Sequence, residues 1–341
     1  MIDQISSDES KMYSNQKLPE RVSMLPNSST ATNRWDYFRV ALNLSGCILQ
    51  IATGYLPQLG VGRRIGKTPY TVKAQPAGIA FSIWGIIFPL CVGYGIYQVL
   101  PGQHTNPLLR RIGMFSAVAF YATIQWSLIA ILAAPDDDDI QGYVAYEWIL
   151  SLTLFYGIAT PLNYILFTLL RYHDNSNNNN SYNNNSNNNN NNNSSVGFGI
   201  VSPKEYFFVV LPLSIFAAWT TLASFVNIAN ALLVSGVENF NVTNGVQGGT
   251  IAYLFCVGLF IALLIFVYRG LLPFAFVTIW AYAWIAEANF ASEYDQVGVL
   301  ATVFTVLFSI VVLVSKLYWA RKNAWLSPAS TATLPQFTEL Q

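Results

Sequence analysis

The segment Gln75-Pro-Ala-Gly-Ile-Ala-Phe-Ser-Ile-Trp-Gly85 opens a run, residues 74–103, that contains no Asp, Glu, Lys or Arg. A helix of about 20 mainly apolar residues can cross a bilayer, so this run predicts a transmembrane helix. Proline near its start suits a first helical turn. Small residues at helical spacings predict close packing against a second helix. They are Gly78, Ser82, Gly85 and Gly93.

The composition predicts that several such helices follow one another. The chain has 341 residues, of which 53% are hydrophobic, 15% aromatic and only 10% charged, whereas about a quarter of the residues in ordinary soluble domains are charged. Apolar runs of spanning length fall at residues 38–56, 78–100, 113–134, 148–170, 206–234, 251–268, 271–286 and 297–318. We therefore predict an all-α polytopic membrane bundle of about eight transmembrane helices.

The distribution of charge predicts how the bundle is oriented. Short loops rich in Lys and Arg stay on the cytoplasmic side of a membrane. With eight helices, 13 of the 17 Lys and Arg fall on the side that holds both termini, and the other four lie in the first connection. Both termini are therefore expected in the cytoplasm, although the membrane itself is not identified. The net charge of zero gives no indication of a nucleic-acid partner.

Polar residues inside the predicted spans fall into stripes. Asn43 and Gln50 share one face of the first span with two glycines, and Trp219, Ala223 and Asn227 share a face of the fifth. Buried amides either bond each other between helices or line a pocket for a flat, mostly apolar ligand. Proton relays in membranes use ionisable residues within the spans. Glu147 is assigned to the acidic loop before the fourth span, and only Glu287, near the end of its helix, comes close to lying within one, which disfavours a proton-coupled pump.

Two of these patterns carry a resemblance to a known family. Pro76 is followed eight residues later by Trp84, and Trp219 is followed by Ala223 and Asn227. These residues resemble the TspO/MBR family, the tryptophan-rich sensory proteins or translocator proteins. The sequence around Trp84 is similar to that of the longer members of the family. Trp126-Ser127 looks like the family's Asn-x-x-Trp-Ser, although Thr123 stands where Asn is expected. The likeness covers helices one to five.

The resemblance implies a bundle with a pocket that opens toward the first connection and binds porphyrins or, in some members, sterols. The ligand-binding candidates are Trp84, Phe81, Pro76, Trp219, Ala223, Asn227, Asn43, Gln50 and Trp126. Porphyrin propionates are anions, so basic side chains of the first connection are candidate contacts, with lipid phosphate as the other interpretation. They are Arg63, Arg64, Lys67 and Lys73. No metal site is expected, and no cofactor beyond a bound porphyrin, haem or sterol.

The expected division of the chain follows from these features. A disordered cytoplasmic N-terminus (1–35) precedes a TspO-like five-helix bundle (36–234), three additional transmembrane helices (250–322) and a flexible tail (323–341). Within the bundle, the Asn-rich segment 174–200 is expected to be a disordered loop, because it cannot bury enough apolar surface to order itself.

The predicted function is that of a membrane sensor, chaperone or carrier that binds a planar hydrophobic ligand, rather than a conventional enzyme. Its expected partners are the lipid bilayer and that ligand, and a homo-oligomer is left open. One alternative is a secondary transporter for a small neutral solute. It would use the amides of Asn43, Gln50, Gln125 and Asn163. The other is a porphyrin-degrading catalyst that uses Trp84 and Trp219.

Overall fold

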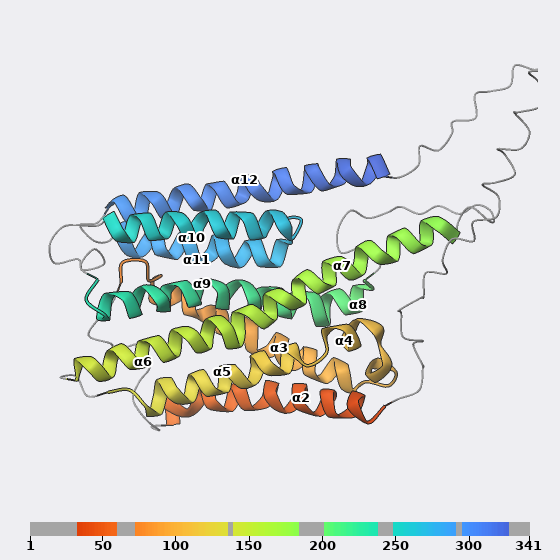
Figure 1. Ribbon diagram of the computed structural model, residues 1–341, viewed down its shortest axis with the longest axis horizontal. Coiled ribbons are helices and arrows are strands. Elements are labelled where there is room, and N and C mark those ends of the chain that lie inside the picture. Colours follow the sequence, from red (N-terminus) through yellow and green to blue (C-terminus); the bar gives the residue numbers. More distant parts are fainter. Residues whose placement is uncertain are drawn as a thin grey trace, which may run out of the picture. The chain divides into compact units, whose positions relative to one another are not determined.

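The computed structural model describes residues 33–59, 72–135, 139–183, 201–237, 248–290 and 295–326. From Arg34 onward the described residues belong to one compact unit. They form helices joined by short connections, and this described part of the chain contains no β-strand (Figure 1).

Five long helical segments come first. They are α2 (Arg34–Tyr55); the 3₁₀-helix η2 (Gly78–Ile83) with α3 (Trp84–Val99); α5 (Phe115–Leu132); α6 (Ile140–Leu152) with the π-helix η4 (Thr153–Ala159) and α7 (Thr160–Asn183); and α8 (Pro203–Glu205) with the π-helix η5 (Tyr206–Val210) and α9 (Leu211–Val234). Three follow: α10 (Gly248–Val267), α11 (Leu272–Phe290) and α12 (Asp295–Leu326). Short elements lie in the connections: η1 (Leu56–Leu59), η3 (Gln103–Thr105) and α4 (Pro107–Ile112).

Six of these segments are long and apolar enough to cross a membrane. They are Gly78–Val99, Phe115–Leu132, Ile140–Arg171, Pro203–Val234, Gly248–Val267 and Gln296–Lys322. The more polar α2 and α11, of 22 and 19 residues, occupy the other two predicted spans. The predicted all-α polytopic bundle is therefore confirmed.

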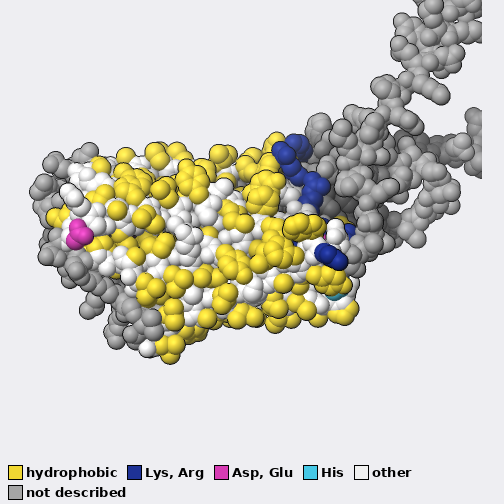
Figure 2. Space-filling view, turned by 60° about the horizontal axis from the view of Figure 1, so that its bottom comes forward, with side chains coloured by type: hydrophobic (Ala, Val, Ile, Leu, Met, Phe, Trp, Pro, Cys, Tyr) yellow, Lys and Arg dark blue, Asp and Glu magenta, His cyan; other side chains and the backbone are white. Residues whose placement is uncertain are grey.

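The surface of the bundle matches a membrane environment. Hydrophobic side chains cover most of the length of the face in Figure 2, whereas Lys and Arg gather near one end and an acidic side chain lies at the other. Large apolar side chains of α12 are among those exposed, including Leu313 at 61% and Leu317 at 52%. In water such a surface would be costly, but in a bilayer it contacts lipid chains.

Two prolines account for the two π-helical turns. Proline lacks an N–H, and its ring clashes with the carbonyl four residues earlier. Pro161 follows η4 and Pro212 follows η5, so in each case that carbonyl lies within the π-helical turn, which accommodates the missing hydrogen bond. Thr160 helps by donating its hydroxyl to the carbonyl of Phe155 at 2.8 Å.

The start of the fourth helix corrects one prediction. The fourth span was placed at residues 148–170 with Glu147 in the preceding loop, but α6 begins at Ile140 and Glu147 is buried in it, with 4% exposure. Asp139 caps this helix by accepting a hydrogen bond from the N–H of Gly142 at 2.8 Å. A buried carboxyl group therefore lies inside a span, whereas Glu287 of α11 is exposed. The inference against proton coupling assumed that no acidic residue lies within a span, and the position of Glu147 removes that assumption.

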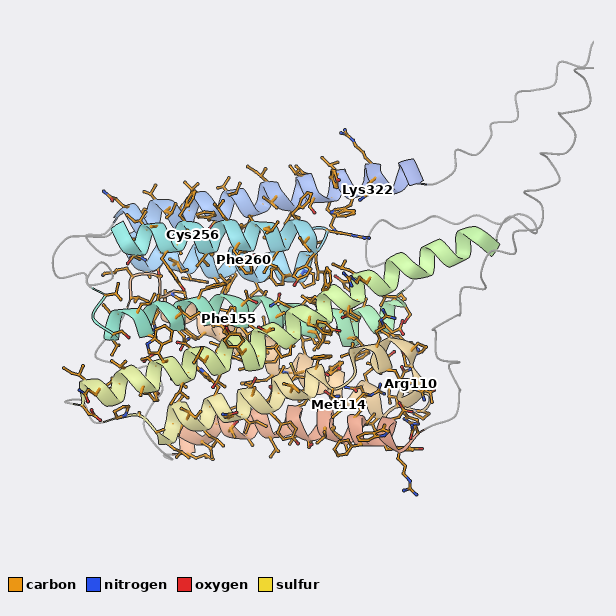
Figure 3. The ribbon with its side chains drawn as sticks, viewed as in Figure 1. Arg110, Met114, Phe155, Cys256, Phe260 and Lys322 are labelled. Atoms are coloured by element: carbon orange, nitrogen blue, oxygen red, sulfur yellow. The ribbon has the colours of Figure 1, made fainter. Side chains whose placement is uncertain are left out.

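The last three helices are joined to the first five by hydrogen bonds and ring contacts. Asn163 of α7 donates to the Thr221 hydroxyl of α9 at 2.7 Å and accepts from the Tyr268 hydroxyl, beside the end of α10, at 2.8 Å. A row of rings makes a second link: Phe225 of α9 lies 6.1 Å from Phe155 and 5.6 Å from Phe260 of α10 (Figure 3). The bundle is therefore continuous from α2 to α12.

Several predicted boundaries shift or lie outside the described residues. Helix α7 runs through Asn183, so it includes the first part of the segment 174–200 that was expected to be disordered. Helix α12 likewise runs to Leu326, into the predicted tail 323–341. The remainder of both segments, and residues 1–32, lie outside the described part of the chain.

Candidate functional site

An aromatic cluster joins the two helices that the sequence singled out. Trp219 of α9 lies edge-on to Phe81 of η2, with ring centroids 5.4 Å apart, and edge-on to Trp84 of α3 at 6.5 Å. Phe216, one helical turn before Trp219, lies 6.0 Å from Trp84. Edge-to-face arrangements are favourable for aromatic rings. We call Phe81, Trp84, Phe216 and Trp219 the aromatic cluster.

The aromatic cluster extends from the core to the surface. Phe216 and Trp219 are buried, with 0% and 3% exposure, whereas Trp84 is half-buried and Phe81 is 42% exposed. A flat ligand could therefore meet ring edges and faces at Phe81 without entering a closed cavity. Phe81 brings the cluster to the exposed side of η2.

The rest of the predicted face of α9 adjoins the cluster. Ala223 and Asn227, one and two turns beyond Trp219, are both half-buried. The Asn227 amide nitrogen donates to the carbonyl of Ala223 at 2.9 Å, and its oxygen accepts no hydrogen bond from the described residues. A half-buried acceptor on this face could bond a polar group of a ligand.

Helix α11 holds the chain that leads into η2. The N–H of Ala77 donates to the carbonyl of Trp284 at 3.1 Å, and the indole of Trp280 donates to the carbonyl of Ala80 at 3.3 Å. Asn289 donates to the carbonyl of Lys73 at 2.8 Å. These bonds satisfy backbone groups that precede or begin a helix. Pro76 is buried within the same segment.

Trp280 and Trp284 were not among the predicted site residues. Their rings lie 5.4 Å apart, both are half-buried, and both bond to the segment around η2. The sequence offered one indication of these two residues: their spacing of four places them on the same face of a helix. Nothing local showed that this face meets η2, about 200 positions earlier in the chain.

Asn43 has a structural role. It is fully buried, its nitrogen lies 3.4 Å from the Gln98 oxygen of α3, and its oxygen accepts from the Ser116 hydroxyl of α5 at 2.7 Å. Ser116 also lies 2.8 Å from the Tyr94 hydroxyl. This network joins α2, α3 and α5 by hydrogen bonds, as amides often do between membrane helices.

Gln50 differs from Asn43 although both lie on the same stripe. Its side chain is fully buried beside Cys91 of α3, yet neither amide atom has a partner with hydrogen-bond geometry. An unsatisfied buried amide is costly. Gln50 is therefore the better of the two for bonding a water molecule or a polar ligand group.

The remaining predicted residues divide by position. Trp126 of α5 is half-buried and packs against the main core and a smaller one around Tyr143 and Tyr146. Its buried indole N–H has no partner, and no ring contact among the described residues joins it to the aromatic cluster. Lys73 contributes its carbonyl to Asn289. Arg63, Arg64 and Lys67 lie outside the described residues.

A small apolar cavity lies between α9, α10 and α11. Its lining residues are Ala74, Leu222, Phe225, Val226, Tyr253, Leu254, Val257, Tyr282 and Ile285. Its volume of about 10 Å³ suits roughly one water molecule. A planar ligand could not fit there without a rearrangement of the helices, so the exposed edge of the aromatic cluster is the better candidate.

Comparison with known protein families finds a match over most of the chain. The family described as TSPO-like protein matches residues 41–315, from α2 into α12. The chain belongs to this TSPO-like family. The match extends beyond the first five helices, which carried the resemblance in the sequence, so the last three belong to the matched region as well. No curated protein and no solved structure shows significant similarity to the chain.

Proposed function

We propose that this integral, multi-pass TSPO-like protein binds a planar, largely apolar ligand, of the porphyrin or sterol kind, and acts as a sensor, chaperone or carrier. The aromatic cluster carries the proposal, because the ring of buried Trp219 contacts both the half-buried ring of Trp84 and the exposed ring of Phe81. Pockets for such ligands combine aromatic walls with a few polar groups. Asn227 supplies an acceptor two turns beyond Trp219 in α9, and Gln50 supplies a buried, unsatisfied amide on α2.

The contacts of the amides argue against the transporter alternative. A path for a neutral solute would need amides that converge on a polar cavity, but Asn43 and Asn163 are engaged in bonds between helices. Gln125 is exposed on the outer face of α5. Asn43 and Asn163 therefore serve helix association. Gln50, the fourth amide of that alternative, is the one that is buried without a hydrogen-bond partner among the described residues, so the arrangement favours a binding protein.

Native mass spectrometry of the full chain, purified in mild detergent, tests ligand binding. We expect a co-purifying tetrapyrrole or sterol, or stoichiometric uptake of added protoporphyrin. Only apo protein under both conditions would contradict the proposal. Loss of the added porphyrin with formation of a breakdown product would instead support the catalytic alternative, in which Trp84 and Trp219 take part in the reaction.

We further propose that the basic end of the bundle faces the cytoplasm. Arg34, Arg110, Lys204 and Lys322 lie in α2, α4, α8 and α12 at the end that holds the start of α2 and the end of α12 (Figure 1). Positively charged short loops are retained in the cytoplasm. Protease added outside sealed right-side-out vesicles should leave an N-terminal tag intact. Cleavage of that tag in sealed vesicles would reverse the proposed orientation.

A further inference from the structure

The turn between α10 and α11 has an unusual backbone. Arg269 has a φ of +56°, and it is the only non-glycine residue with positive φ in the described part of the chain. Gly270 follows with a φ of +65°, and its N–H closes the turn on the carbonyl of Ile265 at 2.8 Å. A left-handed arginine is strained and persists only where its surroundings hold it.

Two cationic groups lie over one indole, Arg269 from the turn and Lys322 from α12. The guanidinium carbon of Arg269 lies 4.5 Å from the ring centroid of Trp319 in α12, and the ammonium of Lys322 lies 4.8 Å from the same ring. The indole N–H of Trp319 donates to the carbonyl of Phe266 at 3.3 Å. The ring is thus fixed while the two cations converge on it.

Lys316 of α12 packs against the same turn. Its stem packs along Gly270, with carbons 3.4 and 3.5 Å from the point where a Cβ would lie. Among the described residues, neither Lys316 nor Lys322 forms an ion pair. Figure 3 shows Lys322 near the end of α12. Like charges gathered on one ring repel each other, and an anion between them would relieve that repulsion.

The surroundings indicate which anion fits. Tyr318 and Trp319 are residues of the kind that lies at the headgroup level of a bilayer. The apolar side chains of Leu313, Val314 and Leu317 point outward from the preceding turns of α12. A phospholipid carries both groups that fit here: its phosphate would lie at the cations, and its acyl chains would lie along this apolar surface.

We propose that Arg269 and Lys322, whose cationic groups lie over Trp319, bind the phosphate of an anionic phospholipid together with Lys316 beside Gly270, and that the acyl chains of this lipid lie along α12. Arginine forms paired hydrogen bonds to phosphate oxygens, and the two lysines add point charges. This site lies at the turn between α10 and α11 and uses no residue of the aromatic cluster.

The test measures lipid retention by native mass spectrometry of the full chain in equal phosphatidylglycerol and phosphatidylcholine. The wild type should retain phosphatidylglycerol preferentially. The double variant Arg269→Asn, Lys322→Gln should lose about fivefold in retention for each charge removed. Asn tolerates the left-handed conformation, so the turn should keep its shape. Arg34→Gln is the matched control, because it removes an exposed arginine from α2 at the same end.

The outcomes separate the proposal from its rivals. Equal retention of phosphatidylglycerol by the wild type and the double variant would overturn the site. An equal loss of phosphatidylglycerol in Arg34→Gln would show that the effect depends on charge in general and not on this site. Millimolar inorganic phosphate should leave the bound lipid in place, because it lacks acyl chains. If inorganic phosphate displaces the lipid, the site recognises soluble phosphate and the lipid assignment is overturned.

Discussion

Replacing Trp219 by alanine should destabilise the bundle by roughly 3 kcal/mol, because truncating a large buried side chain leaves a cavity that the neighbours only partly fill. The loss persists in a membrane, where packing rather than water exclusion holds helices together. Trp219 has 3% exposure and contacts Phe81 and Trp84 across the interface of α9 with η2 and α3. Thermal unfolding in detergent, followed by circular dichroism, measures the change.

Trp219→Phe is the matched variant. It keeps an aromatic ring at the position, so it should remain folded and lose only about 1 kcal/mol of ligand binding, the scale of one aromatic contact. An alanine variant as stable as the wild type would show that the contacts of Trp219 with Phe81 and Trp84 do not hold the helices together.

Replacing Gly258 by alanine should destabilise the last three helices by about 1 to 3 kcal/mol, the usual cost of overpacking a core. A Cβ at this position of α10 would overlap the ring of Phe304 in α12. That ring has 1% exposure and lies 5.7 Å from the rings of both Tyr282 and Phe308, so it has little room to move. Thermal unfolding again gives the measurement.

Gly85→Ala is the control for this substitution. A Cβ on Gly85 meets nothing within 4 Å, and alanine is the better helix former by about 0.5 to 1 kcal/mol. The two glycine variants should therefore move stability in opposite directions. Equal effects would show that α10 does not pack on Phe304 as described.

The helices were largely predictable because their signal is local. A run of apolar residues long enough to cross a bilayer has few other uses, and the predicted spans coincide with helices. Helix ends were less predictable. Glu147 was read as part of an acidic loop, whereas the cap at Asp139 starts the helix earlier and places the carboxyl group inside it. Hydropathy averaged over a window does not register a single capping residue.

The candidate site was predictable only in part. Trp84 and Trp219 were both singled out as candidates, from two different helices and the family resemblance, and their ring centroids lie 6.5 Å apart. The small residues of the second span were expected to pack closely, but Gly78 and Gly85 have no neighbour at their Cβ positions. Small side chains allow a second helix to pack closely, but they do not ensure that one does.

Partners distant in the chain set the remaining limit. Asn43 and Gln50 look equivalent in one stripe, yet only Asn43 meets Gln98 and Ser116. Likewise, the contact of Trp280 with Ala80 joins helices seven and two. One sequence shows which residues share a helix face, whereas the partner of that face depends on how all the helices assemble.

The most direct test of the central claim is a protoporphyrin titration of the purified full chain, followed by tryptophan fluorescence. The account predicts saturable quenching in the wild type, and much weaker binding in the variant with both Trp84→Phe and Trp219→Phe. Asn227→Leu should also weaken binding, by about 1 to 3 kcal/mol if its oxygen bonds the ligand. Trp148→Phe is the control. The indole of Trp148 lies outside the aromatic cluster and donates to the Ser235 hydroxyl, so this variant should bind protoporphyrin as the wild type does. Unchanged affinity in the double variant would contradict the aromatic cluster as the binding site.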